Sequence, residues 1–368
     1  MSGNFLTFTK RVLPLSNTFV ANQAKYLKDY QPVFTGFTFD QSGRHLVDNY
    51  QTCALQSLSK FPKLDKFLLE GFARVPKQWT NSLKDFSPEF IHAHFGKCGF
   101  YAAPIANALS IPLVVTFHGS DITEKDKFSY NQKHRQKVYQ QASKVFASSN
   151  FIAKKLLENG CPEDKLFTHY IGVDTEFFKP TGNKAEKPTV LFVGRLIKQK
   201  GCQFLLEAMR EVEKAIPEVE LLIVGDGVEK KALQAQAKNL KKVKFLGSQK
   251  QQKIRSLMDE AWVMCAPSVR MQRGNEEGLG MVFLEAQAMG TPVVSFKTGG
   301  VIEAVEDGKT GLLVEEKNIK ALADSLIQLL RNSNLREAYS RQSIARVKQL
   351  FDLETQTRFI EQIYHSLS

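Results

Sequence analysis

The chain has 368 residues, of which 43% are hydrophobic and 24% are charged, and this indicates a globular protein of two domains rather than a disordered chain. The five cysteines are scattered without a C-x-x-C pair, which excludes a disulfide framework and a cysteine zinc site and is typical of the reducing cytoplasm; no apolar run is long enough to span a membrane or has the form of a signal peptide. The net charge of +12 is spread over both halves of the chain, so we interpret most of it as a solvated surface rather than a nucleic-acid-binding block.

Short apolar strands alternate with amphipathic helices along the chain. In the first half, the pattern predicts strands at 90–95, 112–119 and 143–149 and a helix at 101–110. In the second half, it predicts strands at 189–194, 219–227, 243–247, 262–268 and 291–296, and helices at 202–215, 228–240, 251–261 and 280–290. This alternation is typical of parallel sheets with right-handed crossovers, and the predicted fold class is therefore α/β with doubly wound sheets.

Residues 177–189 contain two prolines, a glycine and four charges, and they indicate a linker. We therefore expect two Rossmann-like domains, residues 1–180 and 181–349, with a last helix within 350–368 that packs back on the first domain. Ligands of doubly wound sheets bind at the carboxyl ends of the strands, so two such domains facing each other would form a deep cleft.

Two glutamates, Glu277 and Glu285, flank a stretch that contains Gly278 and Gly280. Glu285 lies in an otherwise apolar helix, where a buried carboxylate needs either a salt bridge or cap within the protein, or the hydroxyls of a ligand. The two glycines allow the backbone to approach a ligand closely, and the amides of 279–282 lie near a helix N-terminus, which attracts phosphate.

A basic loop follows the first strand of the second half. Gly194 and Gly201 bracket three basic residues, among them Arg195 and Lys200. Cations at the carboxyl end of a strand are suited to bind a diphosphate, although a solvated turn is the alternative. The loop is neither a P-loop nor a G-x-G-x-x-G dinucleotide motif.

Histidines end two strands of the first half. His118 is followed by Gly119 and is expected to point into the cleft, while His92 and His94 lie on one face of their strand. Three histidines suit zinc, but no carboxylate motif completes such a site. We favour core packing for one histidine and substrate contact for another.

The motifs together resemble a known family. V-G-R-L-I-K-Q-K-G, V-G-D-G and E-G-L-G-M-V-F-L-E followed by A-M-G-T-P-V-V are similar to the retaining family-four glycosyltransferases, glycosyl transferases group 1, of the GT-B fold. H-A-H-F-G, H-G-S-D and G-V-D extend the resemblance into the first half. P-L-S-N-T-F-V resembles the opening of bacterial exopolysaccharide transferases of the colanic-acid type.

The resemblance implies a role for each matching residue. Arg195 and Lys200 would bind the donor diphosphate, Glu277 would face the anomeric centre of the donor sugar, Glu285 would accept from the ribose hydroxyls, and His118 would contact the transferred sugar from the other domain. The further donor contacts that it implies are Gly194, Gly247, Gly278, Leu279, Gly280, Met281 and Val282. The acceptor or N-terminal-domain contacts that we assign beside them are Ser16, Asn17, His94 and Asp121.

The implied reaction moves a sugar from a nucleotide diphosphate sugar, a UDP-sugar rather than a GDP-sugar, to a hydroxyl of a glycan or lipid-linked acceptor in cell-surface polysaccharide biosynthesis. The first domain would bind the acceptor and the second the donor, and anomeric configuration would be retained. Because Arg195, Lys200 and helix amides would stabilise the leaving diphosphate, and the sequence has no Asp-x-Asp pair, we expect no metal and no other cofactor.

Three other functions compete with this one. A nucleotide-sugar epimerase of the same fold would form product without an acceptor, and a phosphorylase would need a pyridoxal-binding lysine, for which we find no convincing position. A non-catalytic nucleotide-sugar-binding protein is the third, and the presence of Arg195, Lys200, Glu277 and Glu285 together argues against it. Nucleic acid is not an expected partner.

Residues 60–69 alternate lysines with apolar side chains. On one face of a helix this pattern would place four apolar residues (Phe61, Leu64, Phe67 and Leu68) with three lysines beside them (Lys60, Lys63 and Lys66). Such a helix either packs its apolar face on the core or lies at an anionic membrane surface. The lipid-linked acceptors of the exopolysaccharide transferases favour the second interpretation, a cytoplasmic protein bound peripherally to the inner membrane.

Overall fold

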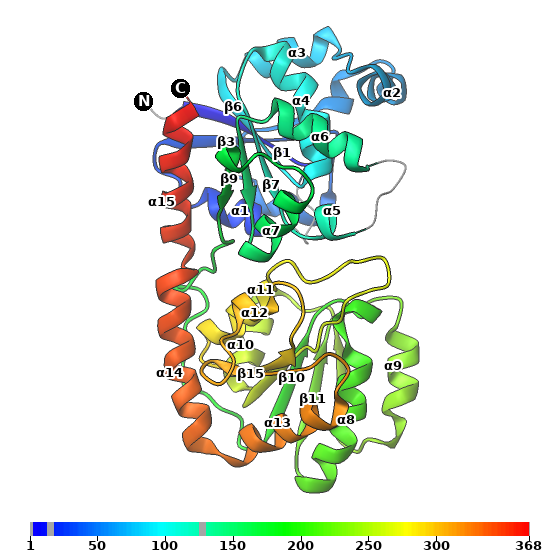
Figure 1. Ribbon diagram of the computed structural model, residues 1–368, viewed down its shortest axis with the longest axis vertical. Coiled ribbons are helices and arrows are strands. Elements are labelled where there is room, and N and C mark those ends of the chain that lie inside the picture. Colours follow the sequence, from blue (N-terminus) through cyan, green and yellow to red (C-terminus); the bar gives the residue numbers. More distant parts are fainter. Residues whose placement is uncertain (1–2, 13–17, 125–129, 368) are drawn as a thin grey trace. The chain divides into compact units, whose positions relative to one another are not determined.

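The structure is a computed structural model that describes residues 3–12, 18–124 and 130–367. The chain forms two compact units, of which unit 1 comprises Met1–Gly172 and Leu353–Ser368 and unit 2 comprises Val173–Asp352. Each unit is built on one main sheet of parallel strands with helices packed against it, so the α/β doubly wound fold class is confirmed (Figure 1).

The chain passes between the units at two places that differ from the predicted linker at 177–189. Gly172 packs so closely on Leu353 that a Cβ atom would lie 2.3 Å from the Leu353 Cα. The next residue, Val173, donates its N–H to the Phe351 carbonyl at 2.7 Å within unit 2. Packing between residues far apart in sequence therefore sets the division, and the polar composition after residue 177 does not.

Unit 1 contains a seven-stranded sheet in the order β5-β3-β1-β6-β7-β8-β9 and a separate short pair, β2 and β4. Its strands are β1 (Gly3–Phe8), β2 (Arg11–Val12), β3 (Tyr30–Gly36), β4 (Thr38–Phe39), β5 (Thr52–Ala54), β6 (Pro88–His94), β7 (Leu113–Phe117), β8 (Lys144–Ala147) and β9 (Leu166–Thr168). Its α-helices are α1 (Thr18–Ala24), α2 (Pro62–Phe72), α3 (Lys77–Lys84), α4 (Gly96–Leu109), α5 (Ser120–Thr123), α6 (Gln132–Gln141), α7 (Asn150–Glu158) and α15 (Leu353–Tyr364).

Unit 2 contains a six-stranded sheet in the order β12-β11-β10-β13-β14-β15. Its strands are β10 (Thr189–Val193), β11 (Glu220–Val224), β12 (Val243–Gly247), β13 (Val263–Cys265), β14 (Val293–Phe296) and β15 (Gly311–Val314). Its α-helices are α8 (Cys202–Ala215), α9 (Lys230–Gln236), α10 (Gln251–Glu260), α11 (Met281–Ala288), α12 (Val301–Ala304), α13 (Ile319–Arg331) and α14 (Ser333–Leu350).

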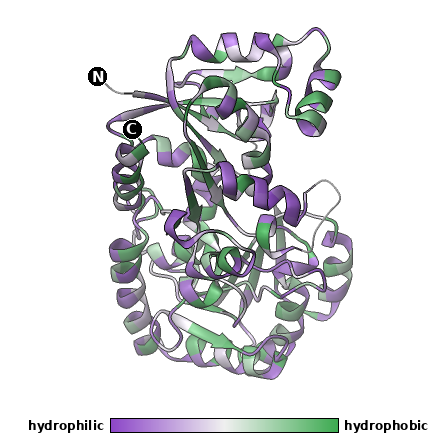
Figure 2. Cartoon of the chain, turned by 45° about the horizontal axis from the view of Figure 1, so that its top comes forward, coloured by the Kyte–Doolittle hydropathy of each residue, from purple (hydrophilic) through white to green (hydrophobic). Residues whose placement is uncertain are grey.

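Both sheets reverse their winding once, between β1 and β6 in unit 1 and between β10 and β13 in unit 2. At such a reversal the loops on the carboxyl side of two neighbouring strands diverge and leave a crevice in which ligands bind. The strands themselves are apolar, as their green colour in Figure 2 shows, because helices cover both faces of a doubly wound sheet. The loops after β10 and β13 and those after β1 and β6 are therefore the places to examine for a site.

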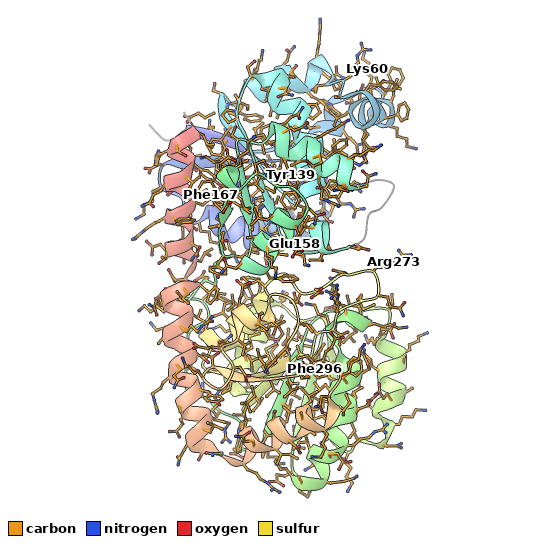
Figure 3. The ribbon with its side chains drawn as sticks, in the orientation of Figure 1. Lys60, Tyr139, Glu158, Phe167, Arg273 and Phe296 are labelled. Atoms are coloured by element: carbon orange, nitrogen blue, oxygen red, sulfur yellow. The ribbon has the colours of Figure 1, made fainter. Side chains whose placement is uncertain are left out.

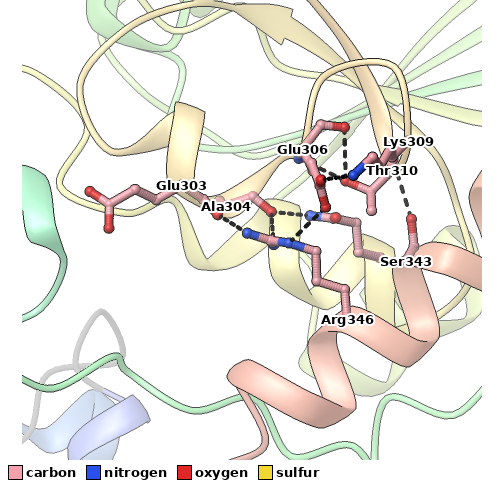
Figure 4. Close-up of polar contacts among 8 residues, drawn as sticks. Glu303, Ala304, Glu306, Lys309, Thr310, Ser343 and Arg346 are labelled. Carbon is pink, nitrogen blue, oxygen red and sulfur yellow. Dashed lines mark hydrogen bonds and ion pairs between the residues drawn. The ribbon is translucent and has the colours of Figure 1, made fainter.

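Arg346 joins helix α14 to the end of α12 within unit 2 (Figure 4). The Arg346 guanidinium donates to the carbonyls of Glu303 at 2.6 Å and Ala304 at 3.0 Å, at the end of α12, and its Nε lies 3.6 Å from the Glu306 carboxylate. Cations near a helix C-terminus are stabilised by its unpaired carbonyls. Arg346 thus closes the short α12, which follows the loop after β14.

Helix α15 completes the core of unit 1. The Tyr364 hydroxyl lies 2.6 Å from the His92 Nδ1, and the buried Glu361 carboxylate accepts the backbone N–H groups of Lys28 and Asp29 at 2.8 and 2.9 Å. A buried carboxylate with two amide donors is satisfied without a cation. The helix is therefore joined to the sheet by polar contacts as well as by apolar packing.

Buried histidines lie beneath this helix. Burial lowers the pKa of His94 to about 3, with the His169 imidazole contributing, and lowers the pKa of His169 to about 4. The His169 Nε2 lies 3.0 Å from the Gln356 carbonyl of α15, where a neutral imidazole can donate. These imidazoles are neutral in the folded protein at neutral pH.

The neutral histidines predict a loss of stability in weak acid. Both pKa values are depressed below the value near 6.5 of the unfolded chain, so below pH 6.5 the unfolded state binds more protons and is favoured. The free energy of unfolding should fall by about 1.4 kcal/mol per pH unit for each of these histidines between pH 6.5 and about 4. Urea unfolding of the full chain at several pH values between 7.5 and 5 measures how steeply the free energy of unfolding changes with pH. A His169→Asn variant should show a shallower slope, whereas exposed His45→Gln should keep the wild-type slope; an equal slope in the His169 variant would contradict the assignment.

Candidate active site

Three loops at the carboxyl edge of the unit 2 sheet pack backbone against backbone. After β10, Gly201 has φ +70°, and a Cβ atom there would lie 1.8 Å from the carbonyl oxygen of Pro267, which follows β13. After β11, Gly225 has φ +134°, and its Cβ would lie 1.9 Å from the Gly194 carbonyl oxygen. Only glycine permits these contacts, so the predicted basic loop is fixed against the loops on both sides.

Lys200 and Glu277 meet in this crevice. The Lys200 Nζ lies 2.5 Å from the Glu277 Oε2, and the Ser268 hydroxyl lies 3.4 Å from the same oxygen. The two charged side chains are only 17% and 14% exposed. In contrast, Arg195 is exposed, and its guanidinium makes no hydrogen bond or ion pair with any residue that the structure describes, so it is available to an anion from solution.

The loop that begins at Glu277 is held from the opposite side by the loop after β14. The Gly300 N–H donates to the Glu277 carbonyl at 2.8 Å, and a Cβ at Gly300 would lie 2.0 Å from the Gly278 carbonyl oxygen. Leu279 is buried, and Gly280, at φ +88°, leads into α11 without supplying a side-chain cap. The first amides of α11 therefore have no side-chain acceptor and are suited to bind an anion.

Glu285 lies one helical turn further along α11 than Met281 and Val282. Burial raises the pKa of its carboxyl to about 7. Within the described residues the Glu285 carboxylate has no hydrogen bond and no salt bridge. The alternative that a salt bridge or cap within the protein satisfies it therefore finds no support among these residues. Glu285 is half-buried, so its carboxylate is partly desolvated and still open to a ligand hydroxyl that could donate to it.

Gly247 ends β12 beside the same edge. Its φ is +66°, its carbonyl accepts the Gly225 N–H at 2.8 Å, and no atom lies within 4 Å of the place of its missing Cβ. The backbone here is exposed to an open space at the carboxyl edge. That placement is compatible with the donor contact expected of Gly247.

In unit 1, His94 and His118 come together from the ends of β6 and β7. The His94 Nδ1 lies 3.3 Å from the His118 Nε2, and the Phe19 and Phe95 rings pack on His118 with centroids 4.8 and 4.7 Å away. The two imidazoles and Phe19 line a cavity of about 20 Å³, enough for one water molecule. The His118 Nδ1 is buried without a partner among the described residues. Burial lowers the pKa of His118 well below 6.5, so its imidazole is neutral and can act as a hydrogen-bond donor or acceptor.

Asp121 holds this histidine in place. Its carboxylate accepts the backbone N–H groups of Gly96 at 2.8 Å, Gly119 at 2.8 Å and His118 at 3.2 Å. The carboxylate thereby joins the loops after β6 and β7, which makes Asp121 a positioning residue for His118. The predicted contacts Ser16 and Asn17 lie outside the described residues.

The histidine arrangement does not match the zinc alternative. Both ring nitrogens of His92 are already in hydrogen bonds, with the Tyr364 hydroxyl at 2.6 Å and the Thr116 hydroxyl at 2.7 Å. No group of three or more His, Cys, Asp or Glu side chains in the described parts of the chain is placed to hold a metal ion. His92 is the histidine that packs in the core.

Several residues of the unit 2 site were not predicted. Ser268 contacts Glu277, the exposed Arg270 pairs with Glu276 at 3.1 Å, and Arg273 lies exposed in the same loop (Figure 3). The T-G-G sequence after β14 (residues 298–300), which packs against the loop that begins at Glu277, was also not predicted. Its position directly after a predicted strand was the available signal.

Comparison with known proteins identifies two matching families. Residues 17–177 match the model of Glycosyltransferase Family 4, and residues 173–346 match that of Glycosyl transferases group 1. The chain is 27% identical over 355 residues to an uncharacterised glycosyltransferase of Methanocaldococcus jannaschii, covering 95% of this chain and 93% of the relative. It is 30% identical over 250 residues to the putative colanic acid biosynthesis glycosyltransferase WcaL of Escherichia coli, covering 66% of this chain and 61% of WcaL. The chain is also 30% identical over 257 residues to the amylovoran biosynthesis glycosyltransferase AmsK of Erwinia amylovora, covering 67% of this chain and 62% of AmsK.

Solved structures share the fold of the whole chain. Anabaena HepE, crystallised with UDP and glucose, superposes with a TM-score of 0.79 at 21% identity, covering 99% of this chain and all of HepE. A glycosyltransferase from Rickettsia africae superposes with a TM-score of 0.81 at 21% identity, covering 100% of this chain and 98% of that protein. With two family matches that together extend from residue 17 to residue 346 and two Rossmann-like units of the GT-B fold, the chain belongs to the group 1 and family 4 glycosyltransferases.

Proposed function

We propose that the protein is a retaining, metal-independent glycosyltransferase that uses a nucleotide diphosphate sugar, a UDP-sugar rather than a GDP-sugar. It transfers the sugar to a hydroxyl of a glycan or lipid-linked acceptor in cell-surface polysaccharide biosynthesis. The observation that carries the proposal is the half-buried Glu285 carboxylate, which has no partner among the described residues and lies one turn from the uncapped start of α11, with Lys200 and Glu277 in the same unit. The Glu285 carboxylate can accept from ribose hydroxyls, the α11 amides can donate to phosphate oxygens, and Lys200 can balance the phosphate charge. Together they complement a ribosyl diphosphate.

The likeness to other proteins supports the finer parts of the proposal. HepE was crystallised with UDP and glucose, and this favours UDP as the donor nucleotide. WcaL and AmsK are named for the biosynthesis of two exopolysaccharides, colanic acid and amylovoran, and this favours a polysaccharide precursor as acceptor.

The proposed reaction breaks the bond between the anomeric carbon and the diphosphate oxygen and forms a bond from that carbon to the acceptor oxygen. Arg195 and Lys200 stabilise the charge that develops on the diphosphate, and the α11 amides add to this effect. The sugar becomes oxocarbenium-like, and the acceptor attacks the face from which the diphosphate leaves. Attack on that face retains the anomeric configuration, and the acceptor proton passes to a phosphate oxygen of the leaving diphosphate.

Glu277 and His118 have separate roles in this reaction. In the free protein Glu277 neutralises Lys200, so a bound diphosphate would compete with Glu277 for the lysine and release the carboxylate towards the donor sugar. His118 is neutral and offers a buried, unpartnered Nδ1 as a hydrogen-bonding atom for a sugar hydroxyl. Asp121 orients it through the backbone.

The two cations should be needed for turnover. Arg195→Ala and Lys200→Ala each remove a charge that stabilises the transition state more than the ground state, so kcat/KM should fall by about 10²-fold or more. Lys198→Ala, which removes an exposed charge from the same loop, is the matched control and should retain near wild-type turnover. Thermal unfolding checks that all three variants fold, and wild-type kinetics in both test variants would refute the assignment.

Glu285 should make donor binding depend on pH. Since the ionised carboxylate accepts through both oxygens and more strongly than the protonated acid, and its pKa is about 7, UDP-sugar affinity should rise between pH 6 and pH 8. Glu285→Gln should remove this rise and weaken binding by ~1.5–3 kcal/mol, and a 2′-deoxy donor should lose less affinity in the variant than in the wild type. Isothermal titration provides both numbers, and equal losses for the two proteins would show that Glu285 does not contact the ribose.

A panel of nucleotide sugars tests the function itself. A UDP-sugar should raise the melting temperature more than its GDP counterpart, and product should form only when an acceptor is present. Because the protein's own cations face the diphosphate, turnover should persist in excess chelator. Activity lost in chelator and restored by magnesium or manganese would overturn the metal-independent mechanism, and product without acceptor would indicate an epimerase.

A further inference from the structure

One short segment of unit 1 carries half of the exposed large apolar side chains that the structure describes. Of ten such residues, five lie between residues 58 and 72: Leu58 (36% exposed), Phe61 (67%), Leu64 (52%), Phe67 (60%) and Phe72 (69%). The other five are scattered over both units. Single exposed apolar residues are ordinary, but a contiguous group marks an interaction surface.

The group forms one face of α2, which we call the α2 face and define as Phe61, Leu64, Phe67 and Phe72. Leu69 is the only buried residue of the helix, and Leu68, which was predicted as part of the apolar face, is half-buried. The alternative that α2 packs its apolar face on the core is therefore wrong for Phe61, Leu64 and Phe67. Phe72 was not predicted as part of the face; its ring packs edge-on against Phe67, with centroids 6.1 Å apart, as an aromatic pair in solvent.

Positive charge surrounds the α2 face. Residues 60–77 contain five basic and two acidic side chains. Lys66 is paired with Glu70 at 3.7 Å. The remaining four basic residues are exposed and have no ion pair with any described residue: Lys60, Lys63, Arg74 and Lys77. Figure 3 shows Lys60 at the outer edge of this region.

We propose that the α2 face binds an anionic lipid bilayer. The four apolar side chains enter the boundary between headgroups and acyl chains, and the unpaired basic residues beside them contact the headgroup phosphates. No described helix is long and apolar enough to cross a membrane, so the proposed attachment is peripheral. The inference goes beyond the proposed function, because binding to lipid requires neither donor nor catalysis, and it would hold unit 1 close to a lipid-linked acceptor.

Charge decides between a bilayer and a second copy of this chain. Two α2 faces brought together would each carry the same unpaired cations, and the resulting repulsion opposes a symmetric dimer. An anionic bilayer instead buries the apolar side chains of the α2 face and pairs its phosphates with the cations. A protein groove that accepts an amphipathic helix is the other occupant to be tested against.

Co-sedimentation of the full-length protein with vesicles tests the proposal. The wild type should bind phosphatidylglycerol vesicles at low salt, bind phosphatidylcholine vesicles at least tenfold more weakly, and lose most binding to phosphatidylglycerol in about 0.5 M salt. The variant Phe67→Ser/Phe72→Ser should lose at least tenfold in affinity, whereas Leu157→Ser, at an exposed position on α7, should not. Lys60→Glu/Lys63→Glu should also lose at least tenfold, and Lys238→Glu/Lys241→Glu in unit 2 is its charge-matched control.

Three outcomes would overturn the proposal. These are no binding to phosphatidylglycerol at low salt, equal binding to the two lipids, and equal loss in the test and control variants. Sedimentation velocity adds a fourth, a dimer that dissociates in Phe67→Ser/Phe72→Ser. Donor-induced thermal stabilisation without lipid reports separately on the proposed function. It should be unchanged in the α2 variants, so a failure of donor binding and a failure of membrane binding are distinguished.

Discussion

The close backbone contact between loops at the carboxyl edge of the unit 2 sheet is the constraint on which the site depends. Parallel strands bring the starts of these loops within a few ångströms of one another, and side chains at Gly201, Gly225 or Gly300 would force them apart. Held together, they place Lys200 from one loop against Glu277 from another. The glycines therefore determine the chemistry of the crevice as much as the charged residues do, because they permit the loop contacts that bring those residues together.

The candidate site residues of the two units differ in charge. Unit 2 keeps charged groups in its crevice: one ion pair, an exposed arginine and a carboxylate without a partner. Unit 1 keeps neutral imidazoles in the corresponding position, because burial depresses the pKa values of His94 and His118. A charged crevice is suited to a nucleotide diphosphate, and a neutral polar one to sugar hydroxyls, which carry no charge to balance.

The sequence patterns predicted the second half of the chain better than the first. Most unit 2 strands are short apolar runs followed by a glycine or a turn, as at β10, so five of the six were predicted to within a few positions, whereas β15 was missed. β1 and β3 were missed because polar or proline residues interrupt them, as at Asn4 and Pro32, and only burial in the assembled sheet makes them strands. The division between the units and the Ser268 contact were missed for a related reason. Each depends on a partner that lies beside it only in the folded chain.

The two crossings between the units give the protein an inserted topology. Unit 2 is one continuous segment, whereas unit 1 is assembled from both sides of that segment and needs Tyr364 to cover His92. During synthesis, the sheet of unit 1 leaves the ribosome first but is without its last helix until unit 2 has been made. The unit that begins the chain is thus the second to be finished, and its buried histidines stay accessible to water for the time that some 180 residues take to be translated, about 10–40 s at 5–20 residues per second.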